Sequence, residues 1–124
     1  MGLDMHLIGE LWFNERDQQQ KFPKQSESYE LGYWRKHPNL HGFIVDEFAD
    51  GIDNCNEIWL SKERLEIIIN AIEQDLLPET TGCFFGISDG SEKESDLTIF
   101  RDALAWLKAE DVRGWRSIHY QASW

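Results

Sequence analysis

The chain has little cysteine, no long hydrophobic run and few basic residues for its size. Its two cysteines, Cys55 and Cys83, cannot form the disulfide framework that stabilises small secreted proteins. No apolar stretch approaches the roughly 18 residues that a membrane-spanning helix needs. The opening MGLDMHLIGELWF lacks the basic leader and the small-residue cleavage site of a signal peptide. We therefore expect a cytoplasmic protein with reduced thiols and no contact with membranes.

Basic residues are scarcest in the middle of the chain. The formal net charge of the 124 residues is −11. Residues 37–92 contain two Lys or Arg against twelve Asp or Glu, whereas the two flanking segments are nearly neutral. Proteins bind nucleic acids largely by neutralising phosphates, so this charge argues against direct binding of DNA or RNA. It suits a basic protein partner, a bound cation or a soluble surface.

Alternation of apolar and polar residues predicts strands at both ends of the chain. In GLDMHLIGELWF, Leu3, Met5 and Leu7 would share one face. Apolar residues also alternate in WRSIHYQASW, and the two terminal strands could pair. EIWL and the glycine-bounded GCFFGIS are two further strand candidates, and Cys83 would be a small buried side chain in the latter. The polar stretch NERDQQQKFPKQSESYE is expected to be a long loop.

Three helices complete the prediction. One would follow Pro38 and stop near Gly51, which can adopt the left-handed conformation of a helix cap. A second follows the N-cap residue Ser61 and carries one apolar stripe. A third follows Ser91, which begins the capping-box pattern SEKE. About four strands and three helices in mixed order indicate one α+β domain over residues 1–124, with the helices packed on a small mixed or antiparallel sheet.

The most acidic stretch is DEFADGIDNCNE, which runs from residue 46 to residue 57. Its spacing does not match an EF-hand, because neither possible starting residue places oxygen ligands at the required positions. We interpret it as the end of a helix and a loop on an acidic surface, and we expect no metal or cofactor. A cation among Asp50, Asp53 and Glu57 is the alternative. The carboxylates that would meet a partner are Asp46, Glu47, Asp50, Asp53 and Glu57.

The histidines support a different hypothesis, a small enzyme or ligand-binding domain. His37 and His41 are four residues apart and would share a helix face, but the glutamate of a zincin motif does not lie between them. His6 and His119 fall on the two terminal strands, close to Asp4. The catalytic candidates under this hypothesis are Asp4, His6, His41 and His119; the other interpretation is that these histidines are structural.

The stretch YWRK places two aromatic residues beside two cations. Trp34, Arg35 and Lys36 could hold an anionic ligand. Bracing of the fold by cation–π contacts is the favoured interpretation. The glycines of GCFFG and SDG predict turns and not a phosphate cradle, because the Gly-Lys-Ser/Thr of a P-loop is missing.

Five short motifs stand out when they are taken together: MGLDM, YWRK with His41 and Phe43 after it, DGIDNC, LPETTGCFFG and YQASW. On these motifs the chain resembles a family of small proteins met mainly in bacteriophage and prophage genomes. The resemblance implies a phage-type accessory protein that acts in the bacterial cytoplasm, and it carries over no catalytic residue. It marks these positions for a shared site: Gly2, Asp4, Tyr33, Trp34, Arg35, Lys36, His41, Asp53, Cys55, Phe85, Gly86, Tyr120 and Trp124.

The leading hypothesis is therefore a non-enzymatic binding protein. Its acidic surface would face a basic patch on a host or phage protein, such as one that binds nucleic acid or acts in host defence. Occupation of that cationic groove would inhibit the partner. A homo-oligomer is also compatible with the sequence.

Overall fold

The computed structural model describes residues 2–82 and 84–124 and has an α+β fold. The elements along the chain are β1 (Asp4–Phe13), β2 (Ser26–Arg35), α1 (Pro38–Phe48), β3 (Ile58–Trp59), α2 (Lys62–Glu73), α3 (Lys93–Lys108) and β4 (Gly114–Ser123). The four strands form one antiparallel sheet in the order β2-β1-β4-β3. The expected fold class is confirmed.

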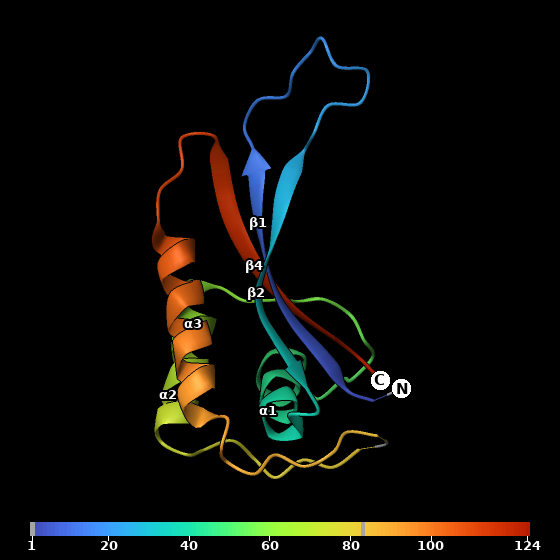
Figure 1. The fold of residues 1–124 in the computed structure, drawn as a ribbon, viewed down its shortest axis with the longest axis vertical. Coiled ribbons are helices and arrows are strands. Elements are labelled where there is room, and N and C mark those ends of the chain that lie inside the picture. Colours follow the sequence, from blue (N-terminus) through green and yellow to red (C-terminus); the bar gives the residue numbers. More distant parts are fainter. Residues whose placement is uncertain (1, 83) are drawn as a thin grey trace.

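One face of the sheet, the core face, carries the buried side chains. Met5 and Leu7 of β1 pair with Ala122 and Tyr120 of β4, and all four are buried. Helix α1 lies on this face, because its His41 is hydrogen-bonded to the Tyr120 hydroxyl. Figure 1 shows α1 near one end of the sheet and α2 and α3 together along its side. The apolar surface buried between these elements is the main term that stabilises the fold.

The other face, the open face, carries polar and aromatic side chains. Because successive residues of a strand point to opposite sides, Asp4 and His6 of β1 lie here together with His119 of β4. Trp12 and Trp115 stack farther along the same face, with ring centroids 5.6 Å apart. The sheet therefore separates the apolar core from a mixed polar and aromatic surface.

Strand β2 is not among the strands expected from the sequence. Residues 26–30 pair with β1, so the expectation of a loop there is wrong, and only residues 14–25 connect the two strands. This connection extends beyond the body of the sheet (Figure 1). The segment SESYE has no apolar alternation because β2 is an edge strand and these five residues are half-buried or exposed.

Of the four strands expected from the sequence, three are confirmed and one is wrong. The terminal strands β1 and β4 pair along their whole length, and EIWL contains β3. GCFFGIS forms no strand over its described residues, which are 82 and 84–88. Phe84 and Gly86 have positive φ angles of 63° and 79°, and such a backbone cannot continue a strand. Cys83, expected to be buried in that strand, lies outside the described residues.

The helix boundaries follow two of the three expected capping signals. Ser61 caps α2 by accepting a hydrogen bond from the backbone N–H of Arg64 at 3.2 Å. Helix α1 ends before Gly51, whose φ of 74° is the left-handed cap conformation. The capping box at Ser91 is wrong, because its hydroxyl donates to Asp89 at 2.6 Å and α3 begins without a side-chain cap.

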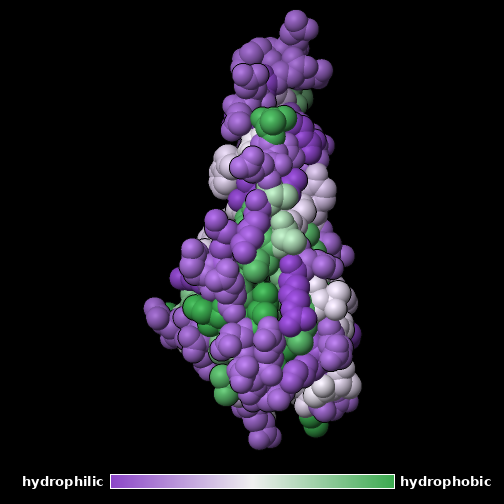
Figure 2. Space-filling view, turned by 90° about the vertical axis from the view of Figure 1, so that its left-hand side faces the viewer, coloured by the Kyte–Doolittle hydropathy of each residue, from purple (hydrophilic) through white to green (hydrophobic). Residues whose placement is uncertain are grey.

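No helix of residues 2–82 and 84–124 has the length and hydrophobicity needed to cross a membrane. Figure 2 shows the side of the molecule on which α2 and α3 lie. Hydrophilic residues cover most of it, and hydrophobic residues form a narrow strip between them. The space-filling view therefore shows no broad apolar surface on this side.

Candidate functional site

The five carboxylates of the expected partner surface run from the last turn of α1 to the start of β3. We call Asp46, Glu47, Asp50, Asp53 and Glu57 the acidic face; each of them is exposed. Among residues 2–82 and 84–124, two ion-pair contacts reach the acidic face, and both come from histidines. Within the part of the chain that the structure describes, no Lys or Arg lies within ion-pair distance of these carboxylates. The acidic face thus keeps its negative charge.

Asp53 is anchored to the core by a buried histidine. The Nε2 atom of His41 lies 3.0 Å from both carboxylate oxygens of Asp53, and its Nδ1 lies 2.6 Å from the Tyr120 hydroxyl. Burial, helped by the charge of Asp53, raises the pKa of Tyr120 well above its usual value. The Tyr120 hydroxyl therefore keeps its proton and donates a hydrogen bond to Nδ1 of His41. The Nε2–H of His41 donates a hydrogen bond to Asp53.

This anchor has little room for a ligand. Phe85 and Trp124 pack against the imidazole of His41, with ring centroids 5.4 Å and 5.7 Å away. The cavity beside it has a volume of about 10 Å³, which is near the lower limit for a single water molecule. Nearby, the side-chain amide of Gln121 donates to the Cys55 carbonyl at 3.2 Å. We conclude that these contacts hold the acidic loop and do not form a substrate pocket.

Several positions marked by the family resemblance meet at this anchor, although they come from four parts of the chain. The set that lies around the His41 ring or in the loop it holds consists of His41, Asp53, Cys55, Phe85, Tyr120 and Trp124.

A second group of marked positions lies on the open face. The Tyr33 hydroxyl donates to Asp4 at 2.7 Å, and the Arg35 guanidinium donates to the same oxygen at 3.0 Å. The hydrogen bond from Tyr33, and then the charge of Arg35, lower the pKa of Asp4; the same bond raises the pKa of Tyr33. These contacts tie the edge strand β2 to β1, so they brace the sheet.

The three candidate ligand-binding residues of YWRK do not converge. Trp34 is buried on the core face, whereas Arg35 reaches Asp4 on the open face. Lys36 follows the strand with a φ of 56°, and its backbone N–H donates to the Leu3 carbonyl at 2.7 Å. Because neighbouring strand residues point to opposite sides, one small anion cannot contact all three side chains.

The four candidate catalytic residues are also divided by the sheet. His41 lies on the core face, while Asp4, His6 and His119 lie on the open face. His6 Nδ1 is 3.2 Å from Glu30, and the buried His119 packs against the Trp59 ring at 5.0 Å. Within residues 2–82 and 84–124, no three His, Cys, Asp or Glu side chains are grouped as a metal site requires.

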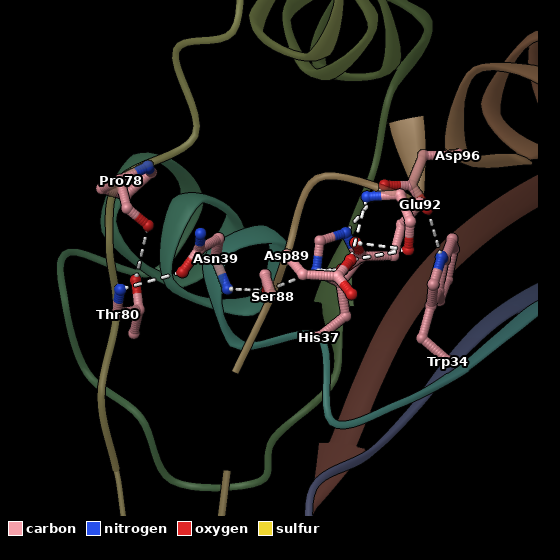
Figure 3. A network of polar contacts seen from close by, with 10 residues as sticks. Trp34, His37, Asn39, Pro78, Thr80, Ser88, Asp89, Glu92 and Asp96 are labelled. Carbon is pink, nitrogen blue, oxygen red and sulfur yellow. Dashed lines mark hydrogen bonds and ion pairs between the residues drawn. The ribbon is translucent and has the colours of Figure 1, made fainter. Parts of the chain in front are cut away.

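Sequence reasoning missed a third polar cluster, centred on His37 (Figure 3). The Nδ1 atom of His37 lies 2.6 Å from the Ser88 hydroxyl, and its Nε2 lies 2.7 Å from an Asp96 carboxylate oxygen. The other oxygen of Asp96 accepts the indole N–H of Trp34 at 2.7 Å. His37, Asp96 and Trp34 are 5%, 1% and 7% exposed, so the chain of hydrogen bonds runs from the core to Ser88.

Three elements place this cluster. His37 immediately precedes α1, Ser88 lies in the segment before α3, and Asp96 is in the first turn of α3. The segment is held to α1 at two points: the Asn39 backbone N–H donates to the Ser88 hydroxyl at 3.1 Å, and the Asn39 side chain accepts from the Thr80 backbone at 3.0 Å.

A cavity of about 160 Å³ opens beside the cluster. Its lining includes His37, Ser88 and Asp96, with Ile72 and Leu77 as its apolar residues. Glu92 also borders it, with a carboxylate oxygen 3.2 Å from His37 Nδ1. Of the spaces described here, this one combines a polar network with a volume that a small molecule could occupy.

Known proteins give no independent indication of function. Comparison of the chain with protein-family models, with curated proteins and with solved structures found no match.

Proposed function

We propose that the protein acts by binding a basic protein partner through its acidic face. The observation that carries the proposal is the set of five exposed carboxylates with no Lys or Arg of the described chain within ion-pair distance. An unneutralised patch of one sign attracts a surface of the opposite sign and accelerates encounter. The whole sequence, at a net charge of −11, adds to this attraction.

The anchor beneath the acidic face supports the same proposal. Asp53 is bonded to His41, and the Cys55 carbonyl is bonded to Gln121 of β4. These contacts fix the loop before any partner binds, so less conformational entropy is lost on association. Asp53 is therefore assigned to holding the loop, while Asp46, Glu47 and Asp50 are assigned to contact with the partner.

The biological setting rests on the family resemblance alone. A phage-type accessory protein in the bacterial cytoplasm would meet host proteins that carry cationic grooves, including those that bind nucleic acid. Occupation of such a groove by the acidic face would block its normal ligand, and the protein would then be an inhibitor without catalytic action on its partner.

The test is a pull-down from nuclease-treated bacterial lysate, with bound proteins identified by mass spectrometry. The wild-type bait is compared with the Asp46→Lys/Asp50→Lys variant, which reverses two carboxylates that form no ion pair within the described chain. Asp53 is left intact, because its removal would release the loop from His41.

The matched control is Asp102→Lys/Glu110→Lys, which changes the net charge by the same amount at two exposed positions, in α3 and just after it. We expect one basic protein to bind wild type and this control, and to be lost from the Asp46/Asp50 variant. Equal capture by all three baits would overturn the assignment of the acidic face.

A further inference from the structure

We propose that Ser88, His37 and Asp96 form a catalytic site that hydrolyses esters of small acyl groups. The proposal goes beyond partner binding. It concerns the cavity beside His37, whose lining includes none of the carboxylates of the acidic face. It rests on four observations: a hydroxyl, an imidazole and a carboxylate in one line of short hydrogen bonds, burial of the last two, a helix N-terminus at the hydroxyl, and a cavity at the same place.

The reactive form of the cluster has a neutral His37 with its proton on Nε2. An ionised Asp96 accepts only, and it receives the indole N–H of Trp34 on one oxygen. Its other oxygen then receives the Nε2–H of His37. In the neutral imidazole, Nδ1 of His37 is then unprotonated and lies 2.6 Å from the Ser88 hydroxyl, so it can take the proton of that hydroxyl.

The exposure of Asp96, His37 and Ser88 differs in the way that a nucleophilic site requires. Asp96 and His37 are 1% and 5% exposed, so water does not compete for their bonds. Ser88 is half-buried and borders the cavity, so a substrate can reach its oxygen. Glu92 lies 3.2 Å from Nδ1 of His37, where its charge would stabilise the imidazolium formed during the reaction.

Helix α1 supplies an amide hydrogen at the reacting oxygen. The backbone N–H of Asn39, in the first turn of α1, points at the Ser88 oxygen from 3.1 Å. The positive end of the helix dipole favours negative charge at this point. When Ser88 attacks an ester carbonyl, negative charge develops on the carbonyl oxygen, two bonds away from the Ser88 oxygen, and the positive end of α1 favours negative charge in this region.

The cavity sets the substrate class. Its volume of about 160 Å³ suits a short acyl chain. Ile72 and Leu77 would contact the apolar part of that chain. Lys93 borders the same cavity, and its Nζ lies 3.1 Å from a carboxylate oxygen of Asp75. Because Asp75 already balances this positive charge, the substrate need not carry a negative charge.

The reaction balances with water as its co-reactant. The Ser88 oxygen attacks the ester carbonyl carbon while its proton passes to Nδ1 of His37. The bond from that carbon to the alcohol oxygen breaks, and His37 returns the proton to the departing alcohol, leaving acyl-Ser88. Water then attacks the same carbon and gives its proton to His37, the carbon–Ser88 bond breaks, and His37 reprotonates Ser88 as the carboxylic acid leaves.

The competing explanation is that Ser88 only caps α1. Two assays on the folded protein separate the two. The first is incubation with a fluorophosphonate probe, followed by mass spectrometry to locate the adduct. The second is hydrolysis of p-nitrophenyl acetate and p-nitrophenyl butyrate by wild type, Ser88→Ala, Asp96→Asn and Ser61→Ala. Ser61 caps α2 and lies outside the cavity, so Ser61→Ala is the matched control for loss of a cap.

We expect the adduct on Ser88, and ester hydrolysis lower by on the order of 100-fold in Ser88→Ala and Asp96→Asn but unchanged in Ser61→Ala. Absence of an adduct on Ser88 in folded wild type would overturn the proposal, even if Ser88→Ala failed to fold. Hydrolysis by Ser88→Ala at the wild-type rate would also overturn it. The Asp46→Lys/Asp50→Lys variant should keep full labelling, so failure here is distinct from failure of partner binding.

Discussion

Replacement of Asp96 by alanine should destabilise the protein more than any surface substitution. The Asp96 carboxylate is 1% exposed and joins two buried donors, the His37 imidazole and the Trp34 indole. Alanine leaves both N–H groups without an acceptor, and each costs about 1–3 kcal/mol. The two losses together should lower the free energy of unfolding by about 3–5 kcal/mol.

Asparagine at position 96 separates stability from catalysis. Its amide oxygen can accept the Trp34 indole N–H, and its NH₂ group can donate to Nε2 of His37. Most of the stability should therefore remain, with a loss of about 1–2 kcal/mol. The proton of His37 must then sit on Nδ1, and a protonated Nδ1 cannot accept the proton of Ser88. Hydrolysis should therefore fail in a folded protein.

The free energy of unfolding is measured by urea unfolding, with circular dichroism as the signal. A loss of about 3–5 kcal/mol corresponds to a fall in melting temperature of roughly 10–20 °C for a domain of this size. The control is Asp102→Ala, an exposed residue of the same helix, which should change stability by less than about 0.5 kcal/mol. An Asp96→Ala variant as stable as this control would refute the reasoning about the buried network.

Three further predictions concern other contacts. Tyr120→Phe removes the donor to buried His41 Nδ1 and should lower the free energy of unfolding by about 1–2 kcal/mol, measured by urea unfolding. Hydrogen bonds from the Arg113 side chain and backbone lower the pKa of Asp111 in the folded protein. The contribution of Asp111 to stability is therefore present above the pKa of the unfolded state and is lost as the pH falls through the pKa of the folded state. Asp111→Asn should make the melting temperature less sensitive to acid below about pH 4. Gly114→Ala would place a Cβ against the Trp12 carbonyl and should cost about 1–3 kcal/mol by the same urea assay, and a wild-type value would contradict the close approach of β1 and β4.

Elements with a clear period could be predicted from the sequence. The alternation of Met5 and Leu7 reflects the covered face of β1, and the stripe after Ser61 reflects the packed face of α2. The polar edge strand β2 could not be predicted, since edge residues need not alternate. GCFFGIS misled for the opposite reason: its side chains are hydrophobic, but the backbone at Phe84 and Gly86 turns to positive φ.

The sites were predictable only in part. Exposure of the acidic face followed from five carboxylates within twelve residues, which cannot all be buried unpaired. The anchoring role of Asp53 could not be seen, because its partner His41 also bonds Tyr120, which is 79 residues farther along the chain. His37 and Ser88 are separated by 51 residues, so no local spacing could reveal their hydrogen bond.

The most direct test of the acidic face is the salt dependence of binding to the captured partner. Affinities of wild type, Asp46→Lys/Asp50→Lys and Asp102→Lys/Glu110→Lys would be measured from about 0.05 to about 0.5 M salt, over which screening of exposed charges grows strongly. We predict steep weakening for wild type and the α3-region control, and weak binding of the Asp46/Asp50 variant at every salt concentration. The same affinity for all three proteins, unchanged by salt, would contradict the account.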